Sequence, residues 1–305
     1  SVPRLVDSLP NGPRHFATVQ VFLAGGVPEM MLHLRDLDLL KLDAPTVTGR
    51  TLGENLEWWE KSARRRRLKE KLKQLDGIDS DDVIMSSARA KSRGLSSTVT
   101  FLQGNLAPEG ALIKSTAIDR RRLDENGVYD HTGPARVFTT EAAAIQAIKD
   151  GKLVAGDILV LMGIGPGNGM PETYQVTSAL KYMKGGDQIA LVTDGRFSGV
   201  STGACLGHVS PEAWAGGAIG KVREGDTIRL LVDTMNLTGS IDVVDDAAKE
   251  FVARERHPDL QQDSRIAADT RLWSALQNAS GGSWGGCVYD ADRIAELLTK
   301  SLAVE

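Results

Sequence analysis

Cysteines, aromatic residues and long apolar runs are scarce in this chain of 305 residues. Its two cysteines, Cys205 and Cys287, exclude a disulfide framework and predict a reducing, cytoplasmic compartment. Two thiols are also too few to hold an iron–sulfur cluster in the usual all-cysteine way. No apolar run is long enough to cross a bilayer, and the first residues lack a secretory signal pattern.

An excess of positive charge is also absent, because the net charge is −4. This balance argues against a nucleic-acid partner. Four consecutive arginines at residues 64–67 are the exception, and a nucleic-acid-binding arm is one interpretation of them. We favour the solvated face of a helix, because Leu68, Leu72 and Leu75 supply an apolar stripe beside the run.

Apolar residues make up 41% of the chain and charged residues 25%, as in soluble globular proteins. The first part has helical spacing, with a break at residues 25–28 inside the helical region 17–42 and a capping-box pattern at Thr51 and Glu54. Strands are predicted at residues 97–102, 111–116, 135–139, 157–162, 188–193, 227–233 and 238–244. Helices are predicted at residues 141–150, 170–183, 245–255 and 271–277, and from residue 290. The sequence therefore predicts an α+β chain with a boundary near residue 90.

A turn rich in functional groups follows an apolar strand at residues 190–201, Ala-Leu-Val-Thr-Asp-Gly-Arg-Phe-Ser-Gly-Val-Ser. It contains an acid, a cation and a hydroxyl, Asp194, Arg196 and Ser198, with glycines that allow unusual backbone angles. An arginine beside a serine lowers the cost of negative charge on the hydroxyl, which favours a catalytic turn. Taken alone, the motif fits a glycine-rich structural corner equally well.

A glycine-rich loop, Gly163-Ile-Gly-Pro-Gly-Asn-Gly169, joins a predicted strand to a predicted helix. One interpretation is a dinucleotide-binding unit, but the glycine spacing departs from that fingerprint and Glu172 would repel a pyrophosphate. Another makes Glu172 a ligand of a hard divalent cation, and a third makes it an ordinary acid at a helix N-terminus. Glu172 and Ser198 follow adjacent predicted strands, so one cleft could contain both.

Other polar residues have structural alternatives, which are favoured for His208 and Cys205. Asn105, Glu109 and Lys114 could line a polar site, or belong to a hairpin with a charged edge. His208 is a candidate acid or base, with a hydrogen-bonded structural histidine as the alternative. Cys205 lies among small residues, which is typical of a buried apolar position.

Four ordered blocks, at residues 104–110, 165–172, 190–201 and 207–213, together resemble the dihydroxy-acid and sugar-acid dehydratases. Residues 22–36, 54–59, 202–205 and 269–273 are most similar to the xylonate dehydratase branch. The resemblance implies a hydro-lyase that removes water from an aldonate such as D-xylonate and gives a 2-keto-3-deoxy acid. Dihydroxyacid or phosphogluconate dehydratase, and a dinucleotide-binding oxidoreductase, are the alternatives.

The resemblance also implies roles for individual residues. Ser198 would be the base that removes the C2 proton, and Glu172 one ligand of Mg²⁺, with Mg²⁺ and an iron–sulfur cluster as Lewis acids. Asp194, Arg196 and Ser201 would support the site or bind substrate. Some sugar-acid relatives have a hydroxyl residue two positions after the serine, where this chain has Val200.

The cluster cysteines and the other Mg²⁺ ligands belong to the family's N-terminal half, and none of those motifs is present. We therefore expect the C-terminal half of a longer enzyme, inactive by itself. Residues 1–90 would be the helical tail of an α/β domain, and residues 91–305 a β-barrel-like swivelling β/β/α domain. The expected partners are a sugar acid and further copies in a homo-oligomer, a dimer or tetramer, with no nucleic acid and no membrane.

Overall fold

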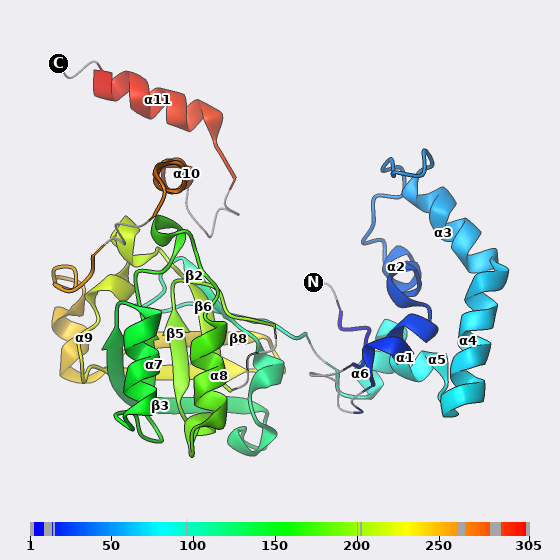
Figure 1. The fold of residues 1–305 in the computed structure, drawn as a ribbon, viewed down its shortest axis with the longest axis horizontal. Helices are drawn as coiled ribbons and strands as arrows, with labels where there is room; N and C mark the ends of the chain where they lie inside the picture. The colour runs from blue at the N-terminus through cyan, green and yellow to red at the C-terminus, as the bar shows by residue number, and fades with distance from the viewer. Residues whose placement is uncertain are drawn as a thin grey trace. The chain divides into compact units, whose positions relative to one another are not determined.

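The computed structural model describes residues 3–8, 14, 16–95, 97–199, 201, 203–261, 266–280 and 288–302. Cys287 and Val200 lie outside these ranges. The chain divides into two compact units, Ser1–Thr98 and Val99–Glu305, and Figure 1 shows the elements of each. What each unit represents in a longer protein stays a prediction.

The described part of the first unit is helical. Its helices are α1 (Thr18–Leu23), α2 (Gly26–Arg35), α3 (Leu52–Lys61), α4 (Ala63–Asp76), α5 (Ser80–Val83) and α6 (Ser87–Ser92). The break between α1 and α2 is confirmed, and Thr51 and Glu54 form the predicted capping box at the start of α3. Helix α2 ends before the predicted end at residue 42, and the backbone at Asp38 is left-handed (φ 55°).

The four arginines at residues 64–67 lie on α4, which confirms the helical interpretation. Arg65 forms an ion pair with the buried Glu29 of α2, at 2.7 Å from Nε to Oε2. Leu72 of α4 is fully buried, as predicted, whereas Leu75 is 71% exposed. The predicted apolar stripe is therefore wrong at Leu75.

The second unit contains an eight-stranded mixed sheet in the order β1-β2-β6-β5-β4-β3-β7-β8. The central strands β3, β4, β5 and β6 run parallel, and the outer pairings are antiparallel. The strands are β1 (Thr100–Leu102), β2 (Gly110–Ile113), β3 (Val128–Phe138), β4 (Ile158–Leu161), β5 (Ala190–Thr193), β6 (Cys205–Ser210), β7 (Thr227–Asp233) and β8 (Thr238–Val243). The α-helices are α7 (Glu141–Lys149), α8 (Tyr174–Tyr182), α9 (Asp245–Phe251), α10 (Ala268–Ala279) and α11 (Ala291–Leu302).

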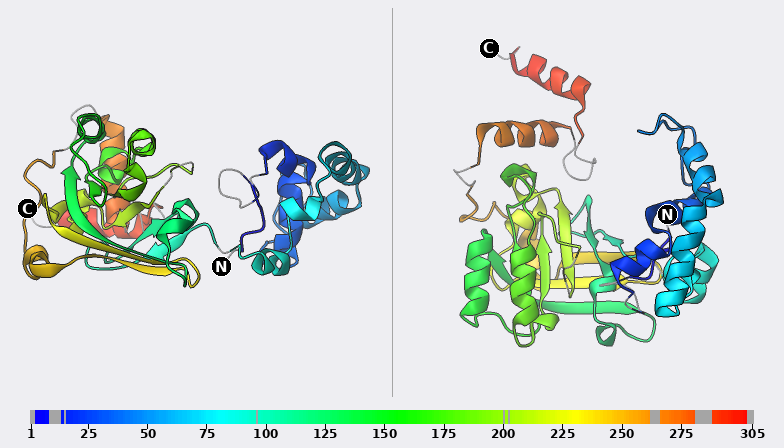
Figure 2. Two further views of the ribbon diagram at one scale, coloured as in Figure 1. Left: turned by 90° about the horizontal axis from the view of Figure 1, so that it is seen from below. Right: turned by 45° about the vertical axis from the view of Figure 1, so that its right-hand side comes forward.

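The two outer strands of this sheet meet through the main chain of Gln103. Gln103 follows β1 and forms a parallel bridge with Ser240 of β8. Its N–H donates to the carbonyl of Gly239 at 3.2 Å, and its carbonyl accepts from the N–H of Ile241 at 3.2 Å. The eight strands therefore form a nearly closed, barrel-like sheet, whose curvature is visible in Figure 2.

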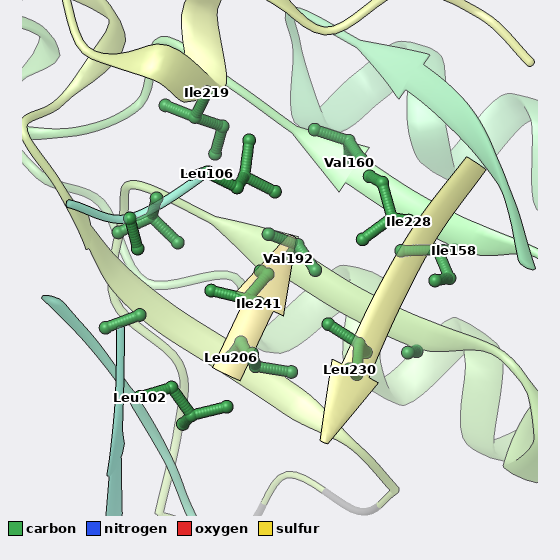
Figure 3. Packing of buried hydrophobic residues seen from close by; sticks show 14 of the residues in the cluster. Leu102, Leu106, Ile158, Val160, Val192, Leu206, Ile219, Ile228, Leu230 and Ile241 are labelled. Atoms are coloured by element: carbon green, nitrogen blue, oxygen red, sulfur yellow. The ribbon is translucent and has the colours of Figure 1, made fainter. Parts of the chain in front are cut away.

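Alternate side chains of the central strands separate the core into two layers. Ile158 and Val160 of β4 belong to the cluster inside the barrel-like sheet, shown in Figure 3. Leu159 and Leu161 belong to a second cluster, which α7 and α8 complete from the outer face. Apolar side chains on both faces explain why β4 and β5 are continuous apolar runs.

Most of the predicted strands are confirmed, within a few residues at each end. The parallel pairing of β4 with β5 around α8 also confirms the predicted strand, loop, helix and strand unit. The strand prediction is incomplete at two places. It contains no strand at the position of β6, and it begins β3 at residue 135 instead of Val128. The expectation of an α+β chain is confirmed as a mixed fold of helices around an eight-stranded sheet.

Candidate active site

Three consecutive loops meet at one edge of the sheet, since β4, β5 and β6 are parallel neighbours. The glycine-rich loop follows β4, the serine turn follows β5, and a short segment containing Glu212 follows β6. In both open and barrel-shaped sheets, binding residues commonly follow the carboxyl ends of parallel strands, which makes this edge the candidate site. The main chains of Glu172 and Arg196 form a parallel bridge, so the predicted proximity of the first two loops is confirmed.

Asp194 joins all three loops through its carboxylate. Its oxygens accept the N–H groups of Gly163 and Ile164, both at 3.0 Å, and that of Ala213 at 2.9 Å. The side chain is completely buried. Burial raises the pKa of Asp194, while these N–H donors act in the opposite direction. The contacts of Asp194 are thus structural, and they organise the loops that carry Glu172 and Ser198.

Glu212 fixes the middle of the glycine-rich loop, and the sequence did not single it out. Both of its carboxylate oxygens lie within hydrogen-bonding distance of the Gly167 N–H, at 3.0 and 2.8 Å. Burial raises the pKa of Glu212 to about 7, and the charge of Asp194 adds to the shift. A Cβ at Gly165 would lie 2.6 Å from Oε2 and 2.9 Å from Cβ of Glu212, so a larger residue here would displace the Glu212 side chain. The sequence contained one signal for Glu212: it belongs to the block at residues 207–213, one of the four ordered blocks, which also include part of the glycine-rich loop.

Glu172 lies at the far end of the glycine-rich loop and is exposed. Helix α8 begins after it, at Tyr174, so the predicted helix start at residue 170 is too early. The backbone at Met170 is left-handed (φ 51°), which delays the helix. An exposed carboxylate at this loop end can reach a hard cation.

The serine turn is held by several main-chain hydrogen bonds. The N–H of Ser201 donates to the carbonyl of Ser198 at 3.0 Å. The Nε of Arg196 donates to the carbonyl of Met170 at 2.7 Å, so this guanidinium links the turn to the glycine-rich loop. Ser198 is half-buried, whereas Ser201 is buried and its hydroxyl donates to that of Thr177 at 3.2 Å.

The other polar candidates have different surroundings. The side chain of Asn105 bonds to the main chain of Val243 at 2.8 and 2.7 Å, next to the closure of the sheet. Glu109 accepts the hydroxyl of Ser210 at 2.7 Å. The ammonium of Lys114 donates to the carbonyl of Gly199, directly after Ser198. Lys114 therefore lies at the candidate site, whereas Asn105 closes the barrel-like sheet.

His208 is half-buried in β6, with left-handed backbone (φ 54°). Its N–H donates to the carbonyl of Gly195 at 2.9 Å. Burial lowers the pKa of His208, and the positive charge of Arg196 lowers it further. The neutral imidazole is therefore the favoured form at neutral pH.

The described residues contain no group of three or more His, Cys, Asp or Glu side chains arranged for a metal ion. Burial raises the pKa of Cys205 to about 12, so this thiol is not a thiolate ligand, and its side chain is buried as predicted. Glu172 alone offers an accessible carboxylate in the glycine-rich loop. These residues do not fit an iron–sulfur cluster, and they fit Mg²⁺ only as one ligand of several.

Comparison with known proteins identifies the family. Residues 82–283 match the model described as dihydroxy-acid/6-phosphogluconate dehydratase C-terminal. The chain belongs to this family. Two proteins of Escherichia coli (strain K12), the D-xylonate dehydratases YagF and YjhG, are 57% and 54% identical to it. Each alignment covers 97% of this chain and 47% of the relative.

A dihydroxy-acid dehydratase of Agathobacter rectalis is 42% identical over 83% of this chain and 40% of the relative. The chain thus spans about half the length of the curated relatives it matches. Membership of this family argues against the dinucleotide-binding oxidoreductase. None of the described helices combines the length and apolar character that a membrane span requires.

Proposed function

We propose that this chain is the C-terminal portion of a sugar-acid dehydratase, a hydro-lyase acting on an aldonate such as D-xylonate. The supporting observation is the 57% and 54% identity to two D-xylonate dehydratases over 97% of the chain. Dihydroxy-acid dehydratases match at lower identity, 42% for the Agathobacter rectalis protein. A dihydroxyacid or phosphogluconate dehydratase is therefore the second candidate.

In this reaction the C2 proton and the C3 hydroxyl leave as water, and the resulting enol becomes the 2-keto-3-deoxy acid. Ser198 is the base that removes the C2 proton. Its position in the half-buried turn at the carboxyl-end edge of the sheet supports this role. A free serine is a very weak acid, so the alkoxide needs positive charge and N–H dipoles nearby.

Glu172 supplies one oxygen ligand to Mg²⁺. A bound Mg²⁺ would supply Lewis-acid chemistry there, lowering the pKa of the C2 proton that Ser198 removes. The hydrogen bonds that Asp194 and Arg196 make between the loops support this role, since they set the position of Glu172 relative to the serine turn. We assign the remaining Mg²⁺ ligands and all ligands of the iron–sulfur cluster to the part of the longer relatives that this chain does not match.

The second unit then corresponds to the swivelling β-barrel-like domain, and the first unit to the helical tail of an α/β domain. Ser201 supports the site by joining the serine turn to α8, through its hydroxyl contact with Thr177. The whole enzyme acts in the cytoplasm on a small sugar acid, as a homo-oligomer.

The test uses the longer enzyme, with the sequence of this chain as its C-terminal half. Purified with cluster and Mg²⁺, it should dehydrate D-xylonate faster than 6-phosphogluconate or a branched 2,3-dihydroxy acid. Ser198→Ala should abolish turnover and leave the visible absorption of the cluster unchanged, while Ser178→Ala on α8 should keep turnover. Turnover by Ser198→Ala would overturn the assignment of the base, and a preference for another acid would overturn the substrate.

A further inference from the structure

Lys114 contacts the serine turn from the end of strand β2. It directly follows β2, is 6% exposed, and its ammonium donates to the carbonyl of Gly199. In the same turn, the N–H of Ser201 donates to the Ser198 carbonyl at 3.0 Å. The turn is therefore fixed both by its own main chain and by a buried cation.

A second contact shows that the segment after β2 follows this turn closely. The N–H of Gly203 donates to the carbonyl of Ala117 at 3.0 Å. Lys114 and Ala117 thus contact the chain shortly before and shortly after Ser201. The position of the Lys114 ammonium is defined by the fold and does not depend on a freely rotating surface side chain.

The burial of Lys114 is costly for the fold. Its hydrogen-bonding partner is a carbonyl and not a carboxylate, so no full negative charge compensates the ammonium in this contact. Burial lowers the pKa of Lys114. An apolar side chain of similar length would fill the same space at a lower cost in solvation.

Arg196, the cation that the sequence suggests for Ser198, is arranged differently. Its side chain is exposed and its Nε donates to Met170, toward the glycine-rich loop. Lys114 is the buried cation that contacts the peptide next to Ser198. The two cations therefore have separate contacts: Arg196 joins the serine turn to the glycine-rich loop, and Lys114 binds the carbonyl of Gly199.

We propose that Lys114 is a positioning residue for Ser198, whose ammonium fixes the Gly199 carbonyl and thereby the orientation of the Ser198 hydroxyl toward substrate. This inference rests on the proposed role of Ser198 as the base. A base held by such a contact is ordered before substrate arrives. Loss of the contact should therefore lower the turnover rate and leave substrate binding nearly unchanged.

The test compares variants in the longer enzyme. Lys114→Met should lower kcat about 100-fold, as expected for a misplaced catalytic group, with KM changed less than about twofold. Its Tm should stay the same or rise, because a buried ammonium is removed. Lys114→Arg should recover part of the lost kcat, because it restores a donor. The matched control is Lys221→Met, since Lys221 also donates to a carbonyl, that of Val252 at 2.6 Å, away from the site.

The outcomes separate this inference from the proposed function. An unchanged kcat in Lys114→Met, or a loss of kcat that follows a fall in Tm, would overturn the positioning role. If Ser198→Ala is inactive while Lys114→Met is fully active, only the role of Lys114 fails. If Ser198→Ala is active, the base assignment fails first, and the inference with it.

Discussion

The carbonyl of Arg196 accepts two hydrogen bonds from Thr173, from the N–H at 2.9 Å and from the hydroxyl at 3.1 Å. This contact extends the parallel order of β4 and β5 beyond the ends of both strands. Thr173 directly follows Glu172, and Arg196 lies two residues before Ser198. The proposed metal ligand and the proposed base are therefore parts of one hydrogen-bonded unit.

Asp194→Asn should destabilise the second unit by about 3 kcal/mol, because a side-chain NH₂ would replace an oxygen that accepts buried N–H groups. Urea unfolding followed by circular dichroism measures this loss. Asp233→Asn is the control, since Asp233 also accepts two N–H groups, from Met235 and Asn236, at a more exposed position. Equal losses in the two variants would contradict the central role of Asp194.

Glu212 should make stability depend on pH. Its pKa is raised from 4.5 to about 7, so the folded state binds the proton more tightly than the unfolded state. This contribution is complete below about pH 4.5 and is lost as the pH rises through 7, by up to about 3 kcal/mol. Glu212→Gln should remove the dependence, so urea midpoints of the two proteins should diverge between pH 5 and 8. Parallel curves would contradict the prediction.

Gly207→Ala should destabilise the chain by about 1–3 kcal/mol through overpacking. A Cβ at Gly207 would lie 2.6 Å from Cδ1 of Phe197, inside the serine turn. Gly199→Ala provides the control, because a Cβ there has no atom within 4 Å. Thermal unfolding of both variants checks this, and a lower Tm for Gly199→Ala than for Gly207→Ala would refute it.

Glu29 should control the acid stability of the first unit. Burial opposes its ionisation, but hydrogen bonds from Arg65 and Lys69 outweigh burial and lower the pKa of Glu29 to about 2. The resulting stability is present above about pH 4.5 and is lost as the pH falls toward 2, about 3 kcal/mol in total. Glu29→Gln should lose it already at pH 7. Acid titration of the helical signal, with exposed Glu57→Gln as the control, measures the difference.

Local patterns were sufficient for the strands whose side chains are apolar on both faces. β4 and β5 follow from runs such as Ile-Leu-Val-Leu, because helices cover one face and the barrel-like core the other. β6 lacks this signal, since its sequence includes Gly207 and His208. Gly207 is small because the Phe197 ring packs against it, which is a contact between distant residues that no local pattern contains.

The candidate site shows the same limit. The types of Ser198 and Glu172 and their order along the chain were visible in the sequence, and parallel pairing of two strands was enough to predict their proximity. The carbonyl partner of Lys114 and the N–H partner of Glu212 depend on how separate loops fold against one another. The sequence thus contains the residues that stabilise the site, but it does not indicate which main-chain groups their side chains contact.

The bridge between Gln103 and Ser240 also has a consequence for folding kinetics. It joins the first and last strands of the sheet, which are far apart in the sequence, so the entropy of loop closure opposes its early formation. Until that step, β1 and β8 present unpaired N–H and C=O groups to solvent. A partly folded chain is thus most exposed to pairing with a neighbouring chain at these two strands, and the closure at Gln103 ends that exposure.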